Sequence, residues 1–168
     1  MKYHLRRWQD SDKPSLIRHA NNKKIAMYLR NGFTYPYTEK TADFFLSLVR
    51  DNPDHPLFAI VVDGEAIGGV GLHPQKDIYC KNAEIGYWIS EEYWGQGIMT
   101  QAIKEILDYG WEHLDIDRVV AIIFGTNGGS IKVAEKCGFE LEATLSKTIY
   151  KFGLYEDELI YGIHRPED

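Results

Sequence analysis

Residues 83–100 constrain the fold of this chain more than any other stretch. Their first part alternates as a strand does, and both faces contain β-forming residues. One face has Ile85, Tyr87 and Ile89, and the other has Glu84, Gly86, Trp88 and Ser90. A turn with two glycines follows, Trp94-Gly95-Gln96-Gly97, and apolar residues then recur at helical spacing over residues 98–110. The sequence therefore predicts a strand, a glycine turn and a helix in direct succession.

Such a succession is suited to binding an anion. The first N–H groups of a helix have no intrahelical acceptor, and the helix dipole favours negative charge at that end. Glycine also lets a ligand approach the main chain closely. We therefore predict that the main-chain N–H groups of residues 96–100 hold a pyrophosphate. A plain strand-to-helix turn is the structural alternative, because glycine is common in such turns.

The turn lacks features of two common phosphate-binding motifs, and this limits which ligands could supply the pyrophosphate. Gly95-x-Gly97-x-x-Thr100 is close to the dinucleotide fingerprint, but the third glycine is missing. Glu84 lies on the preceding strand, which is wholly apolar in a dinucleotide-binding fold. The chain has no Gly-Lys-Ser/Thr, which excludes a P-loop. A dinucleotide-dependent oxidoreductase is kept only as an alternative.

A second cluster lies about thirty residues further on. It reads Asn127-Gly-Gly-Ser130, followed by Glu135-Lys136-Cys137-Gly138-Phe139. Together the two clusters resemble the GNAT superfamily, whose members transfer acetyl groups from acetyl-coenzyme A to amines. The first is similar to that family's coenzyme A loop. The second, like Tyr35-Pro-Tyr-Thr-Glu, is most similar to the branch that acetylates the N-termini of ribosomal proteins, and the resemblance covers almost the whole chain.

The composition bounds the class of protein. The length of 168 residues suits one domain, taken as residues 1–168, and 26% charged residues is ordinary for a globular chain. The net charge, 19 − 25 = −6, argues against nucleic acid as a main partner. No apolar run approaches the roughly 20 residues of a membrane span, and the N-terminal residues lack the apolar core of a signal peptide. We therefore expect a cytoplasmic protein without a membrane partner. The sequence does not distinguish a monomer from a homodimer.

The predicted elements alternate between strands and helices. Strands are expected at residues 2–8, 57–62, 66–72, 84–90, 118–124, 139–150 and 154–164, with Asp63-Gly64 as a hairpin turn. Helices are expected after Asp10, from residue 25 to an end near Asn31-Gly32, from Thr38, at 98–113 and from Asn127 to Gly138. The chain is thus α/β, of the α+β type. The GNAT resemblance implies a mixed, mostly antiparallel sheet of six or seven strands flanked by helices, with splayed central strands between which coenzyme A enters.

The resemblance also implies a cofactor site. Its diphosphate part comprises the main-chain N–H groups of Gln96, Gly97, Ile98, Met99 and Thr100. Backbone of Trp88 and Ile89 is expected to polarise the thioester carbonyl, and Asn127 to bond the pantetheine arm, although Asn127 is also a good N-cap. Ser130 is expected among the cofactor-binding residues as well. Trp94 and Met99 depart from the family pattern, which begins with Arg or Gln and ends with Gly or Ala.

Two residues are candidates for proton transfer. Glu84 matches a strand position that serves as the base in several GNAT enzymes; a rim carboxylate paired with a cation, or an anion that positions the substrate, is the alternative. Many relatives use a tyrosine four residues before Gly-Phe as the acid, but that position here is Ala134. The resemblance implies Ser130 as the substitute acid, and an ordinary first-turn helix serine is the alternative.

The acceptor site is expected at the aromatic segment near the proline. Tyr28, Phe33, Tyr35 and Tyr37 line it in this interpretation, and simple packing is the alternative. The six histidines show no metal-ligand spacing, so no metal site is predicted.

The predicted activity is acetyl transfer from acetyl-CoA to a primary amine, the α-amine of a protein or peptide N-terminus, by direct attack on the thioester in a ternary complex. An α-amine is chosen because its pKa of about 7.7–8.0 demands less of a partly hydrated Glu84 than an aliphatic amine near 10.4. The alternatives are a small-molecule acceptor (a polyamine, an antibiotic or an amino-acid analogue) and a non-catalytic acyl-CoA sensor.

Overall fold

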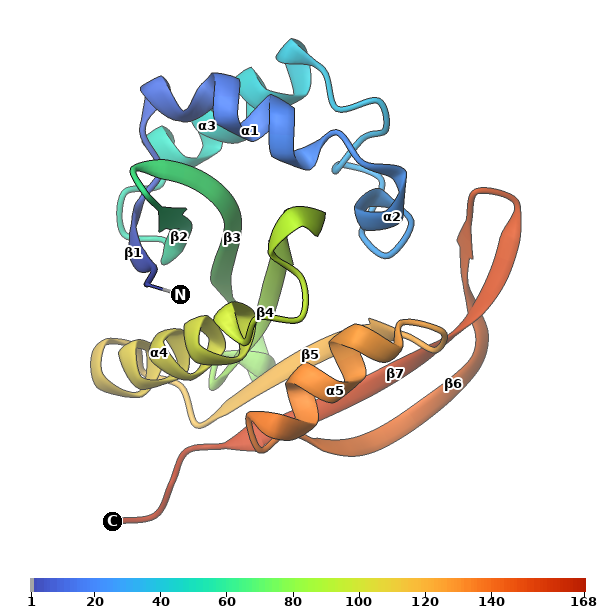
Figure 1. Cartoon of the computed structure of the whole chain (residues 1–168). Coiled ribbons are helices and arrows are strands. Elements are labelled where there is room, and N and C mark those ends of the chain that lie inside the picture. Colours follow the sequence, from blue (N-terminus) through green and yellow to red (C-terminus); the bar gives the residue numbers. More distant parts are fainter. Residues whose placement is uncertain (1) are drawn as a thin grey trace. The chain divides into compact units, whose positions relative to one another are not determined.

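The computed structural model describes residues 2–168 (Figure 1). Its strands form a seven-stranded sheet in the order β1-β2-β3-β4-β5-β7-β6. The strands are β1 (His4–Arg7), β2 (Leu57–Val62), β3 (Glu65–Pro74), β4 (Asn82–Ile89), β5 (Arg118–Phe124), β6 (Glu140–Lys151) and β7 (Leu154–His164). The helices are α1 (Lys13–Ala20), α2 (Lys23–Ala26), α3 (Glu39–Asp51), α4 (Ile98–His113) and α5 (Gly128–Lys136). The pair β4 and β5 is parallel, and the pairs β1–β2, β2–β3, β5–β7 and β6–β7 are antiparallel.

The chain forms two compact units. The first comprises the chain up to Gly71 together with Tyr87–Ala102, and the second comprises Leu72–Gly86 and Ile103–Asp168. The boundaries between them fall within β3, β4 and α4. Among residues 2–168, no helix is both long and apolar enough to cross a membrane.

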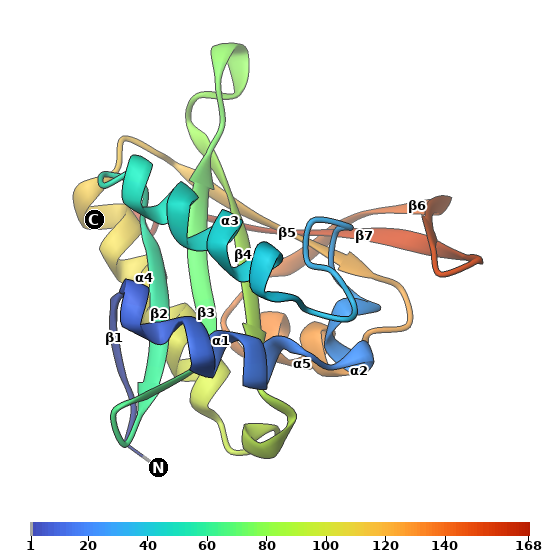
Figure 2. The same ribbon diagram turned by 90° about the horizontal axis from the view of Figure 1, so that it is seen from above.

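In the first unit, α1 and α3 cover one face of the strands β1, β2 and β3 (Figure 2). This cover is expected because both helices have an apolar stripe, which is removed from water when it packs on a sheet. The core between them contains Trp8, Leu16, Ala20, Tyr37, Ala42, Leu46, Val49, Ala59, Val61 and Ala66. The turn from β2 to β3 has Asp63 at φ 50° and Gly64 at φ 81°, the left-handed pair that a two-residue hairpin requires.

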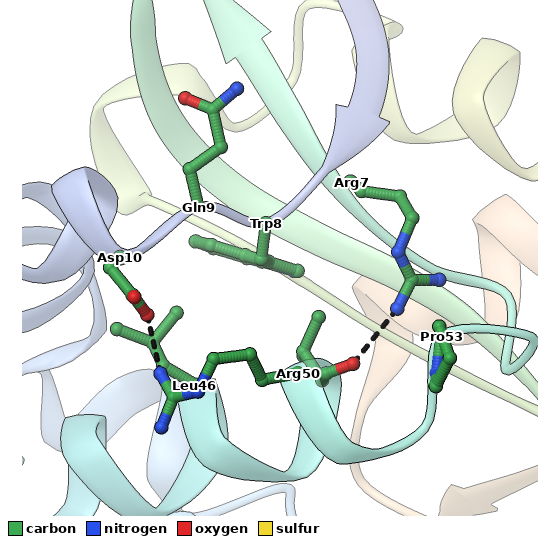
Figure 3. Close-up of a pocket in the computed structure, with 8 residues that line it drawn as sticks. Arg7, Trp8, Gln9, Asp10, Leu46, Arg50 and Pro53 are labelled. Carbon is green, nitrogen blue, oxygen red and sulfur yellow. Dashed lines mark hydrogen bonds and ion pairs between the residues drawn. The ribbon is translucent and has the colours of Figure 1, made fainter.

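Both ends of α3 are capped by side chains. Thr38 is the N-cap, and its Oγ1 accepts a hydrogen bond from the Thr41 N–H at 3.2 Å. At the other end, the Arg7 guanidinium donates to the carbonyls of Val49 at 3.0 Å and Asn52 at 3.2 Å. Figure 3 shows Arg7 at a surface pocket of about 320 Å³, where Arg50 is paired with Asp10 at 2.6 Å. Since both guanidinium groups have partners within the fold, we read this pocket as structural.

In the second unit, β5, β7 and β6 form an antiparallel arrangement with α5 against one face (Figure 1). The end of α5 has the geometry of a glycine C-cap, with Gly138 at φ 93° and the Phe139 N–H donating to the Ala134 carbonyl at 3.1 Å. Arg165 closes the end of α4 by donating to the carbonyls of Trp111 and Ile116, each at 2.6 Å.

The predicted fold class is confirmed, and several element bounds differ from the prediction. Helix α2 ends at Ala26 instead of continuing to an end near Asn31-Gly32. The next N–H groups, those of Tyr28 and Leu29, donate to carbonyls three residues back, so the chain tightens into turns. Strand β3 continues to Pro74, beyond the predicted end at residue 72.

Candidate functional site

The glycine turn lies in the first unit, between the end of β4 and the start of α4. Gly95 has φ 74° and Gly97 has φ 79°, a left-handed conformation that other residues adopt at a cost. No atom lies within 4 Å of the position that a Cβ would occupy at either glycine. The Gln101 N–H donates to the Gly97 carbonyl at 3.2 Å, so α4 starts directly after Gly97. The predicted strand, glycine turn and helix are therefore present.

The turn is held by bonds to the residues that precede it, the last residue of β4 and the 3-10 turn Glu91–Tyr93. The Trp94 indole N–H donates to the Ile89 carbonyl at 2.9 Å, and Gln96 Nε2 donates to the Glu92 carbonyl at 3.2 Å. The Trp94 main-chain N–H donates to the Glu91 carbonyl at 3.1 Å. These three bonds are made by Trp94 and Gln96, and none of them involves Gly95 or the Gly97 main chain.

The side chains at the start of α4 point into the interior of the protein. Ile98 is 3% exposed and Met99 is 7% exposed, whereas Gln96 and Gly97 are exposed. The bulk of Met99, which departs from the family pattern, is therefore buried and does not stand in the open space beside Gly97. An exposed left-handed glycine at the start of a 16-residue helix fits a diphosphate group bound by main-chain N–H donors.

The aromatic residues predicted for the acceptor site are also in the first unit. The Phe33 ring lies 5.0 Å from Tyr37 and 5.4 Å from Trp88. Tyr37 is 4% exposed, and this burial raises the pKa of its hydroxyl to about 12. Tyr35 is 47% exposed, and Tyr28 is half-buried. Packing thus accounts for Phe33, Tyr37 and the Trp88 side chain, and the exposed Tyr35 is the member of the set most open to a ligand.

The second unit holds the candidate proton-transfer residues. Glu84 is half-buried on β4, opposite Val120 in the parallel ladder with β5. Asn127 is the N-cap of α5, and its Oδ1 accepts a hydrogen bond from the Ser130 N–H at 3.2 Å. Ser130 is half-buried in the first turn of α5. The N-cap expected of Asn127 is present, and it fixes the backbone that carries Ser130.

The loop from β5 to α5 is tied to β7. The Gly125 N–H donates to the Asp157 carbonyl at 2.9 Å, and the Thr126 N–H donates to the Glu156 carboxylate at 3.2 Å. These bonds orient the segment that leads to Asn127. Ala134 is 1% exposed, so the position at which many relatives have a tyrosine is within the core of this unit.

A buried polar network beside the glycine turn was not predicted from the sequence. His19 of α1 bonds the Ser90 hydroxyl through Nδ1 at 2.9 Å and the Glu65 carboxylate through Nε2 at 2.9 Å. The His19 side chain is only 1% exposed, and Ser90 is 4% exposed. The three residues are far apart in the sequence and form no motif, so only the fold reveals their contact.

The match to a family model identifies the family of the chain. Residues 2–140 match the model described as an acetyltransferase (GNAT) domain. The chain therefore belongs to the GNAT acetyltransferase family.

Individual relatives within this family differ in the acceptors that their names give. A ribosomal-protein-serine acetyltransferase of Escherichia coli is 31% identical over 106 residues, which cover 63% of this chain and 59% of the relative. A spermidine N(1)-acetyltransferase of Escherichia coli is 29% identical over 136 residues, which cover 80% of this chain and 72% of the relative. Alignments with three Bacillus subtilis relatives span 58%, 67% and 58% of those proteins' length.

Among solved structures, RimL, a ribosomal L7/L12 α-N-protein acetyltransferase in complex with coenzyme A, superposes with a TM-score of 0.83. It is 26% identical to this chain, and the superposition covers 98% of this chain and 94% of RimL.

Proposed function

We propose that this protein is an acetyl-CoA-dependent N-acetyltransferase that acts on the α-amine of a protein or peptide N-terminus. The observation that carries the proposal is the exposed left-handed turn at Gly95 and Gly97, directly before α4, in a chain of the GNAT family. The ribosomal-protein acetyltransferases among the relatives support the choice of acceptor.

The binding part of the proposal uses main chain in the first unit. The N–H groups of residues 96–100 hold the diphosphate, since a helix start supplies donors and a favourable dipole. A main-chain N–H at Trp88 or Ile89 orients the thioester carbonyl. The Asn127 side chain, in the second unit, bonds the pantetheine arm.

The chemical part uses two side chains of the second unit. Acetyl transfer needs a neutral amine, an aligned carbonyl and a proton for the departing thiolate. Acetyl-CoA, when bound, supplies the activated thioester that the amine attacks. As the amine nitrogen bonds to the carbonyl carbon and the carbon–sulfur bond breaks, Glu84 accepts the proton that the amine loses and the Ser130 hydroxyl donates a proton to the leaving sulfur. Glu84 then releases its proton to water, and water returns a proton to Ser130.

The relatives differ in the acceptor that their names give: one is a spermidine acetyltransferase and another acetylates a ribosomal protein. The α-amine is favoured because Glu84 is half-buried and so retains contact with water. A hydrated carboxylate is a weak base, which suits an amine with a pKa of about 7.7–8.0 better than one near 10.4.

The proposal is tested first by assay. Purified protein is incubated with acetyl-CoA and an unblocked peptide beginning with serine, with the same peptide Nα-blocked but containing lysine, and with spermidine. We expect turnover on the unblocked peptide in preference to the other two. Preference for spermidine would make the protein a polyamine acetyltransferase, and no turnover on any amine, with coenzyme A still bound, would indicate an acyl-CoA sensor.

The turn itself is tested with a pair of matched glycines. Gly97→Ala places a methyl group beside the proposed diphosphate, in a strained conformation. Gly64→Ala introduces the same methyl group at φ 81°, in equally open space, in the hairpin from β2 to β3. Both changes strain the backbone by about 1–2 kcal/mol. Only Gly97→Ala should raise the KM for acetyl-CoA, by roughly tenfold or more, because bonds to a charged group contribute about 1.5–3 kcal/mol. Equal KM values in the two variants would mean that the diphosphate binds elsewhere.

A further inference from the structure

Two consecutive asparagines join α1 to α2 and bond two distant segments of the first unit. Asn21 Oδ1 accepts a hydrogen bond from the main-chain N–H of Tyr37, 16 residues away, at 3.0 Å. Asn22 Nδ2 donates to Glu91 Oε1, 69 residues away, at 3.2 Å. Asn22 Oδ1 also accepts from the Lys24 N–H at 2.9 Å and so caps α2. One dipeptide therefore holds both the aromatic segment and the segment that leads into the glycine turn.

The bond to Glu91 reaches the glycine turn through the main chain. The Glu91 carbonyl accepts the Trp94 N–H, and Gly95 follows directly. Lys24 Nζ donates to the other carboxylate oxygen of Glu91 at 2.9 Å. The hydrogen bonds from Lys24 and Asn22 lower the pKa of Glu91, so its carboxylate is charged and its bond with Asn22 is charge-assisted.

The hydrogen bond of His19 with Ser90 stabilises the contact between Asn22 and Glu91. His19, two residues before Asn21, bonds the Ser90 hydroxyl, and the Ser90 carbonyl accepts the Tyr93 N–H at 2.9 Å. A hydrogen bond between two buried side chains is costly to break, because each polar group would lose its partner without gaining water. The exposed ion pair of Lys24 with Glu91 contributes little by comparison. The end of α1 and the end of β4 are thus held together, and the asparagines extend this contact on both sides.

The bond to Tyr37 acts on the aromatic segment where it enters α3. Tyr37 precedes Thr38, the N-cap of α3, and its ring packs on Phe33. The exposed Tyr35 is two residues before the amide that Asn21 holds. A change in the position of Asn21 is therefore transmitted to the main chain next to Tyr35.

We propose that Asn21 and Asn22 are positioning residues that couple the coenzyme A turn to the acceptor segment, residues 28–37. The inference rests on the proposed function, which assigns the two ligands to these segments. A ligand that fixes the glycine turn restricts Glu91, and Asn22 and Asn21 pass this restriction to the Tyr37 amide. Coupling of this kind is reciprocal, so coenzyme A and the acceptor each bind more tightly when the other is present.

The test is hydrogen exchange at the Tyr37 amide, with coenzyme A itself as the probe. In the wild-type protein, saturating coenzyme A should slow exchange of this amide by roughly fivefold or more, the lower end of typical coupling. Asn22→Asp keeps a capping oxygen for α2 but replaces the donor with a charge that repels Glu91. Asn22→Ser also keeps a capping oxygen and adds no charge. Both variants should lose the slowing, and both should raise the KM of the acceptor more than they lower kcat.

The control is Lys13→Met, which removes the ion pairs of Lys13 with Glu39 and Asp43 on the same helix layer. It should leave the response to coenzyme A unchanged. If coenzyme A raises Tm but the Tyr37 amide does not respond, or if the response persists in both Asn22 variants, the inference is wrong and the proposed function stands. If coenzyme A does not raise Tm, the proposed function fails and the coupling fails with it.

Discussion

The two units contribute to the proposed reaction in different ways. The first unit offers main-chain groups at a left-handed turn, with the neighbouring side chains of Ile98 and Met99 buried in the protein. The second offers the side chains of Glu84, Asn127 and Ser130, each on a backbone fixed by a strand ladder or a helix cap. A main-chain site depends on backbone conformation and tolerates changes of side chain. A side-chain site depends on single functional groups, so we expect substitutions in the second unit to affect the chemical step most.

The largest effect is expected at Ser130. If its hydroxyl protonates the leaving thiolate, Ser130→Ala should lower kcat by roughly ten- to a thousandfold, at or just under the usual range for a general acid. The KM for acetyl-CoA should change little, because the proposal assigns the diphosphate to main-chain groups of residues 96–100. Steady-state kinetics with an unblocked peptide measures both constants. A fully active variant would leave solvent or another hydroxyl as the proton source.

A somewhat smaller effect is expected at Glu84. Glu84→Gln should lower kcat/KM by about ten- to a hundredfold, because the amide cannot accept the proton. In the wild-type enzyme kcat/KM should rise with pH and begin to level off near pH 8, since an α-amine with a pKa of about 7.7–8.0 is about half to two-thirds neutral there. A profile that climbs beyond about pH 9.5 would identify an aliphatic amine instead. An unchanged rate and profile in the variant would remove Glu84 as the base.

A matched pair of helix caps compares the two units directly. Asn127→Ala and Thr38→Ala each remove an N-cap hydrogen bond of 3.2 Å, at α5 and α3 respectively. Each should reduce the free energy of unfolding by about 0.5–2 kcal/mol, measured by urea denaturation. Only Asn127→Ala should also raise the KM for acetyl-CoA, by roughly two- to tenfold, the equivalent of one hydrogen bond. If Thr38→Ala changed the KM for acetyl-CoA to a similar extent, the effect of Asn127→Ala would be due to lower stability and not to a lost bond with the cofactor.

The smallest effect on cofactor binding is expected at Met99, where the largest departure from the family pattern occurs. Met99→Ala restores a small residue but opens a cavity, because the side chain is 7% exposed. It should lower stability by about 2–5 kcal/mol and leave the KM for acetyl-CoA within about twofold. A KM that falls strongly would show that the methionine obstructs the diphosphate, and the main-chain interpretation would need revision.

Local patterns in the sequence predicted many elements well. The helix at 98–113 and the strand at 118–124 have the predicted bounds, because an amphipathic period and a continuous apolar run are local signals. The hairpin turn at Asp63-Gly64 was equally clear, since its left-handed conformation limits the residues that fit. The end of α2 was predicted wrongly, because no residue marks the change from α-helix to tighter turns after Ala26.

Some residues of the candidate site could be predicted from local motifs, and others could not. Motif spacing was enough to predict the glycine turn at residues 95–97 and the cap at Asn127. The contact of His19 with Ser90 and Glu65 could not be predicted, because it depends on how α1 packs beside β3 and β4. Spacing in the sequence carries no information about such contacts.

What the sequence determined by itself is therefore local: the succession of strand, glycine turn and helix, the caps, and the GNAT motifs that they carry. The tertiary structure decided which similar residues are buried and which are open to a ligand. Tyr37, in the core of the first unit, is 4% exposed, whereas Tyr155 on β7 is 68% exposed, although both are tyrosines in aromatic segments. The physical reason is that burial depends on long-range packing of apolar surface, while turns and caps depend on the conformation of a few neighbouring residues.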